Sequence, residues 1–299
     1  MPVVLLTIAG TGAAWDWIPG QYPAEAGAAL SDPALIALGQ CWGAPNGKNW
    51  HWQGVGYPAA VAPMGPSVLA GVHETVRLLS PSDIDPFVYP HPWKFVLDGY
   101  SQGAIVACKV WRDHILSPAG QLHGRLNDCL GVITYGNPLR APGIAYGNTE
   151  LWGHPVPDLD DGYTTGGIAG PDCLRPSECL FPAGHPLAGQ IAVYDFANDG
   201  DLYTSAPVGD EPWNRQTVVG HDETIIYNLI QNFSGKNLYG LAKAAIDLFE
   251  QPFSHVWPLF QAIYNGILFA SQGVQAPHWR YDSLPATNYL TNLGKELAA

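Results

Sequence analysis

The segment from Gly99 to Gly103, which reads Gly-Tyr-Ser-Gln-Gly, has the residue types and spacing that point most directly to chemistry. An apolar, strand-like run ends at Leu97, and a helix-like run, Ala104 to Trp111, follows the segment. A serine at such a junction is held in strained backbone geometry, and glycines two positions away let strand and helix approach closely. The pattern therefore predicts a nucleophile elbow with Ser101 at its tip.

A serine nucleophile needs a histidine base, and the imidazole needs a carboxylate that fixes its tautomer and stabilises its charged form. In α/β-hydrolases the chain order is serine, then carboxylate, then histidine. The run from Ile191 to Asp201 predicts a strand that leads into a loop with acidic residues. We prefer Asp201 because the preceding glycine provides a turn that aims its side chain across the sheet edge. Asp199 is the closest rival, and Asp195 falls inside the strand-like run.

Several downstream histidines are candidates for the base. Chain order removes His154 and His185, because both precede Asp201. His255 begins an amphipathic helix, and His221 lies near the start of a helical region. The remaining candidate, His278, lies in a Pro-His-Trp loop after these helices, where a returning catalytic loop is expected.

The negatively charged oxygen of a tetrahedral intermediate needs preorganised hydrogen-bond donors. The backbone N–H of Gln102, the residue after the nucleophile, is the first candidate, and the Thr11 backbone N–H in Gly10-Thr11-Gly12 is the second. The spacing of these glycines matches neither a dinucleotide fingerprint nor a P-loop, so the sequence predicts no phosphate site.

Apolar, strand-like runs recur along the chain, as a mostly parallel α/β sheet flanked by helices requires. Two Gly- and Pro-rich stretches, Gly43 to Gly56 and Pro155 to Gly189, are typical of surface loops, and the longer one could border the site. The strand-like runs are Val3 to Ile8, Phe95 to Leu97, Gly131 to Tyr135 and Ile191 to Tyr194.

Between His221 and Gly273 the apolar pattern is purely helical, with two faces at the 3.6-residue period. The pattern predicts a helical subdomain over 208–273, inserted into a hydrolase core formed by 1–207 and 274–299. Each face is expected to pack on the other or on the core. The faces are Leu241, Ala244, Ala245, Leu248 and Phe249, and Val256, Leu259, Phe260, Ile263, Tyr264, Ile267 and Leu268.

Composition limits the classes of partner. The formal charge of −13 argues against nucleic acid as a partner, and the N-terminus lacks the basic region of a signal peptide. Five cysteines without metal-site spacing predict neither a zinc site nor a disulfide framework, although Cys173 and Cys179 could close a small loop. We expect no metal and no cofactor.

The chain resembles the mycobacteriophage lysin B esterases, relatives of the cutinases within the α/β-hydrolases. The resemblance covers most of the chain. It depends on Gly10-Thr11-Gly12, Tyr57-Pro58-Ala59-Ala60, Pro63-Met64, Pro66-Ser67-Val68, Gly99 to Val106, Gly136-Asn137-Pro138, Asp199-Gly200-Asp201 and Pro277-His278.

The resemblance implies a triad of Ser101, Asp201 and His278, with a helical linker between the last two. Some members of the family carry an N-terminal peptidoglycan-binding domain, and we expect none here because the first strand-like run begins at once. The resemblance also implies hydrolysis of the ester between mycolic acids and arabinogalactan, which detaches the mycobacterial outer membrane. The protein would be made in the host cytoplasm without a signal peptide, contact the outer lipid layer peripherally and need no obligate protein partner. The alternatives are a cutinase-like lipase or polyesterase on simpler esters, and an inactive protein that binds envelope glycolipid.

Overall fold

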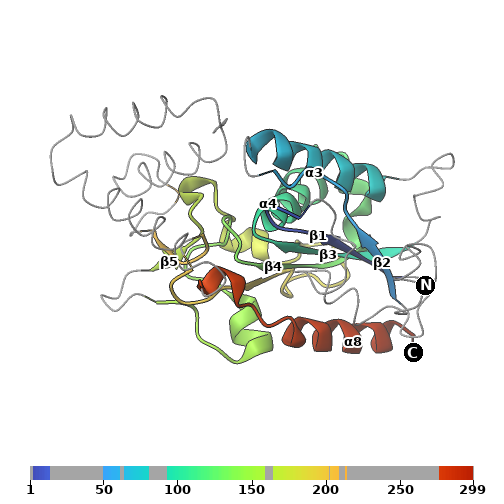
Figure 1. Cartoon of the computed structure of the whole chain (residues 1–299). Coiled ribbons are helices and arrows are strands. Elements are labelled where there is room, and N and C mark those ends of the chain that lie inside the picture. The colour runs from blue at the N-terminus through green and yellow to red at the C-terminus, as the bar shows by residue number, and fades with distance from the viewer. Residues whose placement is uncertain are drawn as a thin grey trace, which may run out of the picture.

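A parallel sheet of five strands runs through the centre of the molecule, in the order β2-β1-β3-β4-β6 (Figure 1). The structure is a computed structural model that describes residues 3–13, 50–60, 64–80, 93–158, 164–201, 203–208, 213 and 276–298. The strands of this sheet are β1 (Val3–Ile8), β2 (Trp50–Gly54), β3 (Lys94–Tyr100), β4 (Cys129–Tyr135) and β6 (Val193–Phe196).

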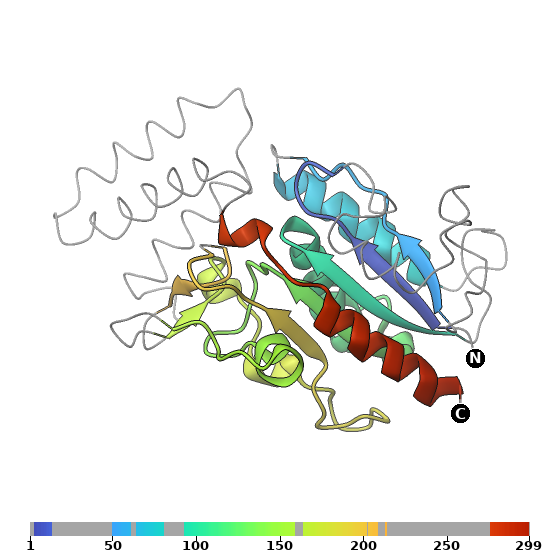
Figure 2. The same ribbon diagram turned by 60° about the horizontal axis from the view of Figure 1, so that its bottom comes forward.

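Helices cover both faces of the sheet (Figures 1 and 2). On one face, α3 (Met64–Leu79) and α4 (Gln102–Lys109) pack over alternate residues of the strands, and on the other face lies α8 (Leu284–Ala298). Side chains that alternate along β1 enter the two layers in turn, so the strand is buried throughout and apolar except for Thr7. Such nearly continuous apolar runs are typical of parallel strands buried on both sides.

The expected α/β class, a parallel sheet flanked by helices, is thus confirmed. The strand expected at Ile191 to Tyr194 lies two residues later in the chain, at β6. The predicted subdomain over 208–273, with both of its amphipathic faces, lies outside the described residues except for residues 208 and 213. No helix in the described ranges is long and apolar enough to cross a membrane.

The assignment of Gly43 to Gly56 as a surface loop is wrong for its last part. Residues Trp50–Gly54 form β2, which pairs in parallel with β1, and Trp50 and Trp52 are fully buried. The alternation of tryptophan with His51 and Gln53 carried this information, because period-two alternation is typical of a strand with one buried face.

The described part of Pro155 to Gly189 is mostly irregular, as expected, but only part of it lies at the surface. Leu174, Cys179 and Phe181 are buried in the main core, and two residues of β5 pair with β7. Burial of side chains from short turns explains how a segment with few long elements stays packed. The short strands and helical turns outside the main sheet are β5 (Thr165–Gly166), β7 (Ala206–Pro207), η1 (Val110–Leu116), η2 (His123–Asp128), η3 (Gly147–Trp152), η4 (Gly170–Asp172), η5 (Pro176–Cys179) and η7 (Pro277–Trp279).

Cys173 and Cys179 do not form the disulfide that their spacing allowed. Both remain buried thiols. Their Sγ atoms donate weak hydrogen bonds to the backbone oxygens of Gly167 and Arg175, respectively. They therefore pack as small apolar side chains.

The carboxyl ends of the parallel strands meet at one edge of the sheet. Ser101 follows β3 directly, and the loop that contains Asp201 follows β6. The turn η7, which contains His278, lies at this same edge, just before α8 (Figure 2). In open α/β sheets this edge is where sites are built, because strand ends and loops converge there.

Candidate active site

Ser101 sits on a strained turn between β3 and α4. Its φ of 55° and ψ of −116° lie in a region that residues with a side chain rarely adopt, and its backbone N–H donates to the Tyr135 carbonyl at 2.9 Å. Gly99 and Gly103 allow the tight packing, because a Cβ on Gly103 would lie 1.9 Å from the backbone oxygen of Ile8. The predicted elbow is therefore present as a local backbone conformation, and Ser101 itself is partly exposed.

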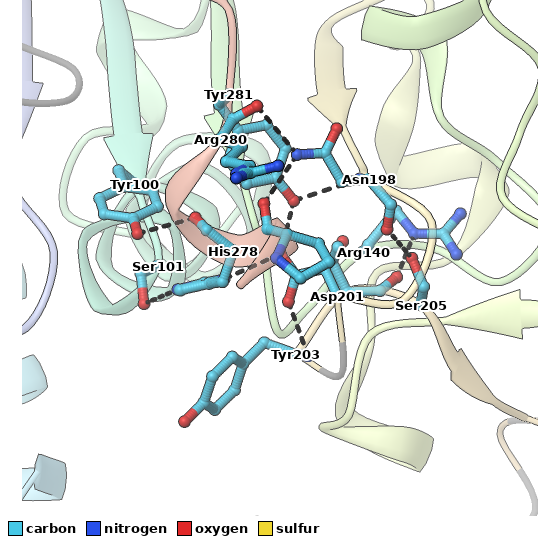
Figure 3. Close-up of polar contacts among 12 residues, drawn as sticks. Tyr100, Ser101, Arg140, Asn198, Asp201, Tyr203, Ser205, His278, Arg280 and Tyr281 are labelled. Carbon is cyan, nitrogen blue, oxygen red and sulfur yellow. Dashed lines mark hydrogen bonds and ion pairs between the residues drawn. The ribbon is translucent and has the colours of Figure 1, made fainter. Parts of the chain in front are cut away.

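His278 reaches Ser101 from a distant part of the chain. Its Nε2 lies 2.9 Å from Ser101 Oγ, and the imidazole is buried between the rings of Tyr100 and Tyr203 (Figure 3). The Tyr100 hydroxyl also donates to the His278 carbonyl at 2.9 Å. Ring packing and this backbone hydrogen bond together fix the imidazole against the serine.

Asp201 completes a hydrogen-bonded chain on the far side of the imidazole. Its Oδ2 lies 2.8 Å from His278 Nδ1, and the carboxylate is fully buried. Gly200, with φ of 74°, makes the expected turn just before it. Because the carboxylate accepts a hydrogen bond from Nδ1–H, the proton of the neutral imidazole stays on Nδ1 and the lone pair of Nε2 faces the serine hydroxyl, as a general base requires.

The rival residues lie elsewhere or have other partners. Asp195 is within β6 and accepts hydrogen bonds from the side chains of Thr134 and Asn137, while Asp199 is exposed. His154 is exposed, and the ring nitrogens of His185 pair with the Cys129 carbonyl and the Leu187 N–H. The other two candidates, His221 and His255, lie outside the described residues.

The Gln102 side chain joins the elbow to the loop after β1. Its Nε2 donates to the Ala60 carbonyl at 2.9 Å and to Thr11 Oγ1 at 3.3 Å, and its Oε1 accepts from Ser67 Oγ at 2.8 Å. Gly10 lies against the serine, because a Cβ there would be 3.3 Å from Ser101 Cβ. Of the two residues predicted as oxyanion donors, Gln102 follows the serine in the chain and Thr11 follows Gly10 and bonds the Gln102 side chain. Their role as donors stays a prediction.

Arg140 anchors the loop that follows Asp201. Its guanidinium is fully buried and donates to the Thr204 carbonyl, to the Ile144 carbonyl and to Thr165 Oγ1, each at 2.6 Å. Burial lowers the pKa of Arg140, but an arginine stays charged in this range. The backbone N–H groups of Thr204 and Ser205 in turn donate to the Asp201 carbonyl, so the guanidinium holds the turn that presents the carboxylate.

Sequence reasoning missed four residues that contact the triad. Tyr281 donates to Asp201 Oδ2, Asn198 bonds the histidine loop, and Tyr203 packs on the imidazole. Gly136, with φ of 56°, gives His278 its space, since a Cβ there would lie 2.6 Å from His278 Cε1. The Gly136-Asn137-Pro138 motif was a signal for this last contact, but the others depend on tertiary proximity.

The described residues hold no cluster of histidine, cysteine or acidic side chains that could bind a metal ion. The site itself places a serine hydroxyl, a histidine imidazole and a buried carboxylate in one hydrogen-bonded line. Such an arrangement can activate a serine hydroxyl for attack on an acyl carbon.

Comparisons with known proteins extend the similarity beyond the serine motif. No protein-family model matches the chain. Endolysin B of Mycobacterium phage L5 is 33% identical over 248 residues, which are 82% of this chain and 87% of that protein. Endolysin B of Mycobacterium phage D29 is 31% identical over 248 residues, with the same coverage of 82% and 87%.

A solved structure shows that the similarity extends to the fold. The crystal structure of lysin B from mycobacteriophage D29 aligns with a TM-score of 0.60 and 29% identity, and the alignment covers 97% of this chain and 98% of that chain. The similarity thus includes nearly the whole length of both proteins.

Proposed function

The chain belongs to the lysin B family of mycobacteriophage endolysins, and we propose that it is a serine esterase that hydrolyses the ester between mycolic acids and arabinogalactan. The observation that carries the proposal is the hydrogen-bonded chain from Ser101 Oγ to His278 Nε2, at 2.9 Å, and from His278 Nδ1 to Asp201 Oδ2, at 2.8 Å. Its three members come from loops at the carboxyl edge of one sheet, and each is held by its own backbone contacts.

In the first half of the reaction, Ser101 Oγ attacks the ester carbonyl carbon while His278 Nε2 takes the hydroxyl proton. Asp201 stabilises the imidazolium that forms, and the backbone N–H groups of Gln102 and Thr11 stabilise the negatively charged oxygen. The intermediate then collapses: the carbon–oxygen bond to arabinose breaks and His278 gives its proton to the departing sugar oxygen. The mycoloyl group remains esterified to Ser101.

In the second half, His278 takes a proton from a water molecule, whose oxygen attacks the acyl-enzyme carbonyl. Collapse of this second intermediate breaks the bond to Ser101 Oγ, which regains its proton from His278. The products are the free mycolic acid and the unmodified enzyme. Every proton moves between substrate, water, Ser101 and His278, so the proposed cycle uses no cofactor.

The mycolate ester is supported by membership of the family rather than by the site alone. Both curated relatives are endolysins of phages that infect mycobacteria, and the sequence motifs resemble those of esterases that detach the mycolate layer. We propose accordingly that the protein is made in the host cytoplasm and acts at the host envelope during lysis, in peripheral contact with the outer lipid layer. The insertion of a helical subdomain at 208–273 into the core belongs to the same proposal.

The test compares wild type with Ser101→Ala on purified mycolyl-arabinogalactan, and free mycolic acids are measured by mass spectrometry. Wild type should release mycolate, and the variant should be slower by about 10³-fold or more, because it lacks the nucleophile. Circular dichroism shows whether the variant is folded. A folded Ser101→Ala protein that releases mycolate at the wild-type rate contradicts the mechanism.

A short ester, p-nitrophenyl butyrate, separates the chemistry from the substrate. If wild type cleaves this ester but leaves mycolyl-arabinogalactan intact, the serine mechanism stands and the natural substrate is a simpler ester. If wild type cleaves neither ester and binds envelope glycolipid, the protein is a binding protein and the esterase proposal fails.

A further inference from the structure

The carboxylate of Asp201 receives more hydrogen bonds than the imidazole alone supplies. Its Oδ2, the atom that faces His278 Nδ1, also accepts a hydrogen bond from the Tyr281 hydroxyl at 2.6 Å (Figure 3). Its Oδ1 accepts from the Tyr203 backbone N–H at 3.0 Å. Tyr281 thus shares one carboxylate oxygen with the imidazole, and a hydroxyl donor to a carboxylate at this distance makes a strong hydrogen bond.

The direction of the Tyr281 hydrogen bond follows from its other partner. The backbone N–H of Asn198 donates to the Tyr281 hydroxyl oxygen at 3.3 Å, so the hydroxyl proton is left for Asp201. Burial, together with the nearby Asp201 charge, raises the pKa of Tyr281 well above its ordinary value, which keeps the phenol protonated as a donor.

Asn198 also ties the histidine segment, residues 276–281, to the loop of Asp201. Its Nδ2 donates to the Pro277 carbonyl at 2.8 Å and to the Arg280 carbonyl at 3.2 Å. Tyr281 belongs to the same segment as His278, and its hydroxyl donates a hydrogen bond to Asp201. The base and the carboxylate are therefore joined directly and, in parallel, through Tyr281.

The other charged or titratable groups near Asp201 do not duplicate this contact. Tyr203 contributes its backbone N–H, and its ring packs on the imidazole. Arg140 interacts with the carboxylate only through its charge, because its guanidinium donates to neutral oxygens. Tyr100 faces the Tyr281 ring and donates to the His278 carbonyl.

From this geometry we infer that Tyr281 is a positioning residue for the triad. Its hydroxyl fixes the orientation of the Asp201 carboxylate, and the negative charge of the carboxylate is shared between this hydroxyl and the imidazole. The inference rests on the proposed serine esterase function. Without the hydroxyl, Oδ2 keeps a single donor, and the carboxylate can turn away from His278. A carboxylate that no longer shares its charge with the phenol also attracts a positively charged imidazole more strongly, so the acid limb of the pH–rate profile is expected to lie at higher pH.

The test variant is Tyr281→Phe, which keeps the ring and removes only the hydroxyl. With p-nitrophenyl butyrate we expect kcat to fall about 10- to 100-fold, the range for a lost hydrogen bond to a charged group. KM should stay within about twofold, because the buried hydroxyl bonds the carboxylate rather than the substrate. The acid limb of kcat/KM against pH should move to higher pH.

Tyr135→Phe is the matched control. Tyr135 is a buried tyrosine of the same aromatic cluster, with ring centroids 5.9 Å from Tyr281, and no hydrogen bond joins its hydroxyl to the triad. The Tyr135→Phe protein should keep the wild-type kcat and pH profile. A folded Tyr281→Phe protein that keeps the wild-type kcat and pH profile as well overturns the inference.

A fluorinated tyrosine at position 281 decides the case in which Tyr281→Phe does not fold. The fluorinated phenol is nearly isosteric and a stronger donor, so the acid limb should move to lower pH, opposite to the effect in the phenylalanine variant. An unmoved acid limb overturns the inference.

The proposed function fails separately. If the proposed function is wrong, wild type neither cleaves the ester nor reacts with a fluorophosphonate. If wild type is active and labelled, and Tyr281→Phe keeps the wild-type kcat and pH profile, only the role of Tyr281 is wrong.

Discussion

Asp201 and Asp98 are both fully buried, yet they occupy opposite environments. The Asp201 carboxylate lies beyond the end of a strand and accepts hydrogen bonds from His278, from Tyr281 and from a backbone N–H. The Asp98 carboxylate lies within β3, beside Thr7 of β1 and Ile133 of β4, and neither of its oxygens has a hydrogen-bond partner among the described residues. Burial raises the pKa of Asp98 well above its ordinary value.

The comparison shows why the site lies where it does. Inside the sheet, the backbone N–H groups are used by the strand ladders, so a carboxyl group finds no donors and stays neutral more easily than charged. Past the strand ends, turns expose N–H groups and bring side chains from distant segments together. Asp195 is intermediate, because within β6 it accepts from Thr134 and Asn137 while burial still raises its pKa.

The largest effect is expected from Asp201→Asn. An asparagine amide carries no charge to stabilise the imidazolium, and its NH2 group can face Nδ1 and favour the wrong tautomer. We therefore expect kcat to fall about 10⁴-fold, as in the serine protease triad. The measurement is steady-state hydrolysis of p-nitrophenyl butyrate. Asp199→Asn, at an exposed position two residues earlier, is the control and should keep the wild-type kcat. Equal losses in the two variants would contradict the assignment of Asp201.

A smaller loss of kcat is expected from Gly136→Ala, which disturbs the contact between His278 and the Asp201 carboxylate without changing any charge. The added Cβ would lie 2.6 Å from His278 Cε1 and 3.2 Å from Asp201 Oδ2. Displacement of the imidazole by this amount should lower kcat by about 10²-fold. Gly184→Ala is the control, because it has φ of 92° but meets nothing within 4 Å. If both glycine variants lose the same activity, backbone strain rather than displacement of His278 is the cause.

The smallest effect is on stability, from Asp98→Asn. The pKa of Asp98 is raised in the folded state, so wild type loses stability as pH rises from the unfolded-state value of about 4 towards the folded-state value. The variant has no such loss. Its free energy of unfolding relative to wild type should therefore increase between pH 4 and pH 8, by about 1.4 kcal/mol for each unit of the pKa shift. Urea unfolding of both proteins at pH 4 and pH 8 measures these free energies. A difference in free energy of unfolding between variant and wild type that does not change with pH would contradict the account.

Local patterns in the sequence predicted the parts of the fold that depend on local geometry. The elbow at Ser101 needs only a strand, a turn with flanking glycines and a helix, and all three are adjacent in the chain. Asp201 was preferred to Asp195 because Asp195 falls inside a strand-like run, and chain order removed His185 because it precedes Asp201. The structure places the chosen residues together.

Long-range contacts were beyond the same reasoning. The Tyr281 hydroxyl meets a carboxylate 80 positions earlier in the chain, and no local pattern encodes that contact. The strand that contains Trp50 and Trp52 was not predicted, because the glycines around it are typical of a loop. In the structure this strand, β2, pairs with β1. The buried carboxyl group of Asp98 was not predicted either, because its burial follows from the position of β3 at the centre of the sheet.

The most direct test of the central claim, that Ser101 is the nucleophile activated by His278 and Asp201, is reaction of the wild-type protein with a fluorophosphonate. Peptide mass spectrometry locates the label, and residual hydrolysis of p-nitrophenyl butyrate is measured on the same samples. The account predicts a single label on Ser101, with activity lost in proportion to labelling, and much slower labelling in Asp201→Asn. Full activity in a labelled protein, or a label on another residue that accounts for the loss, would contradict it.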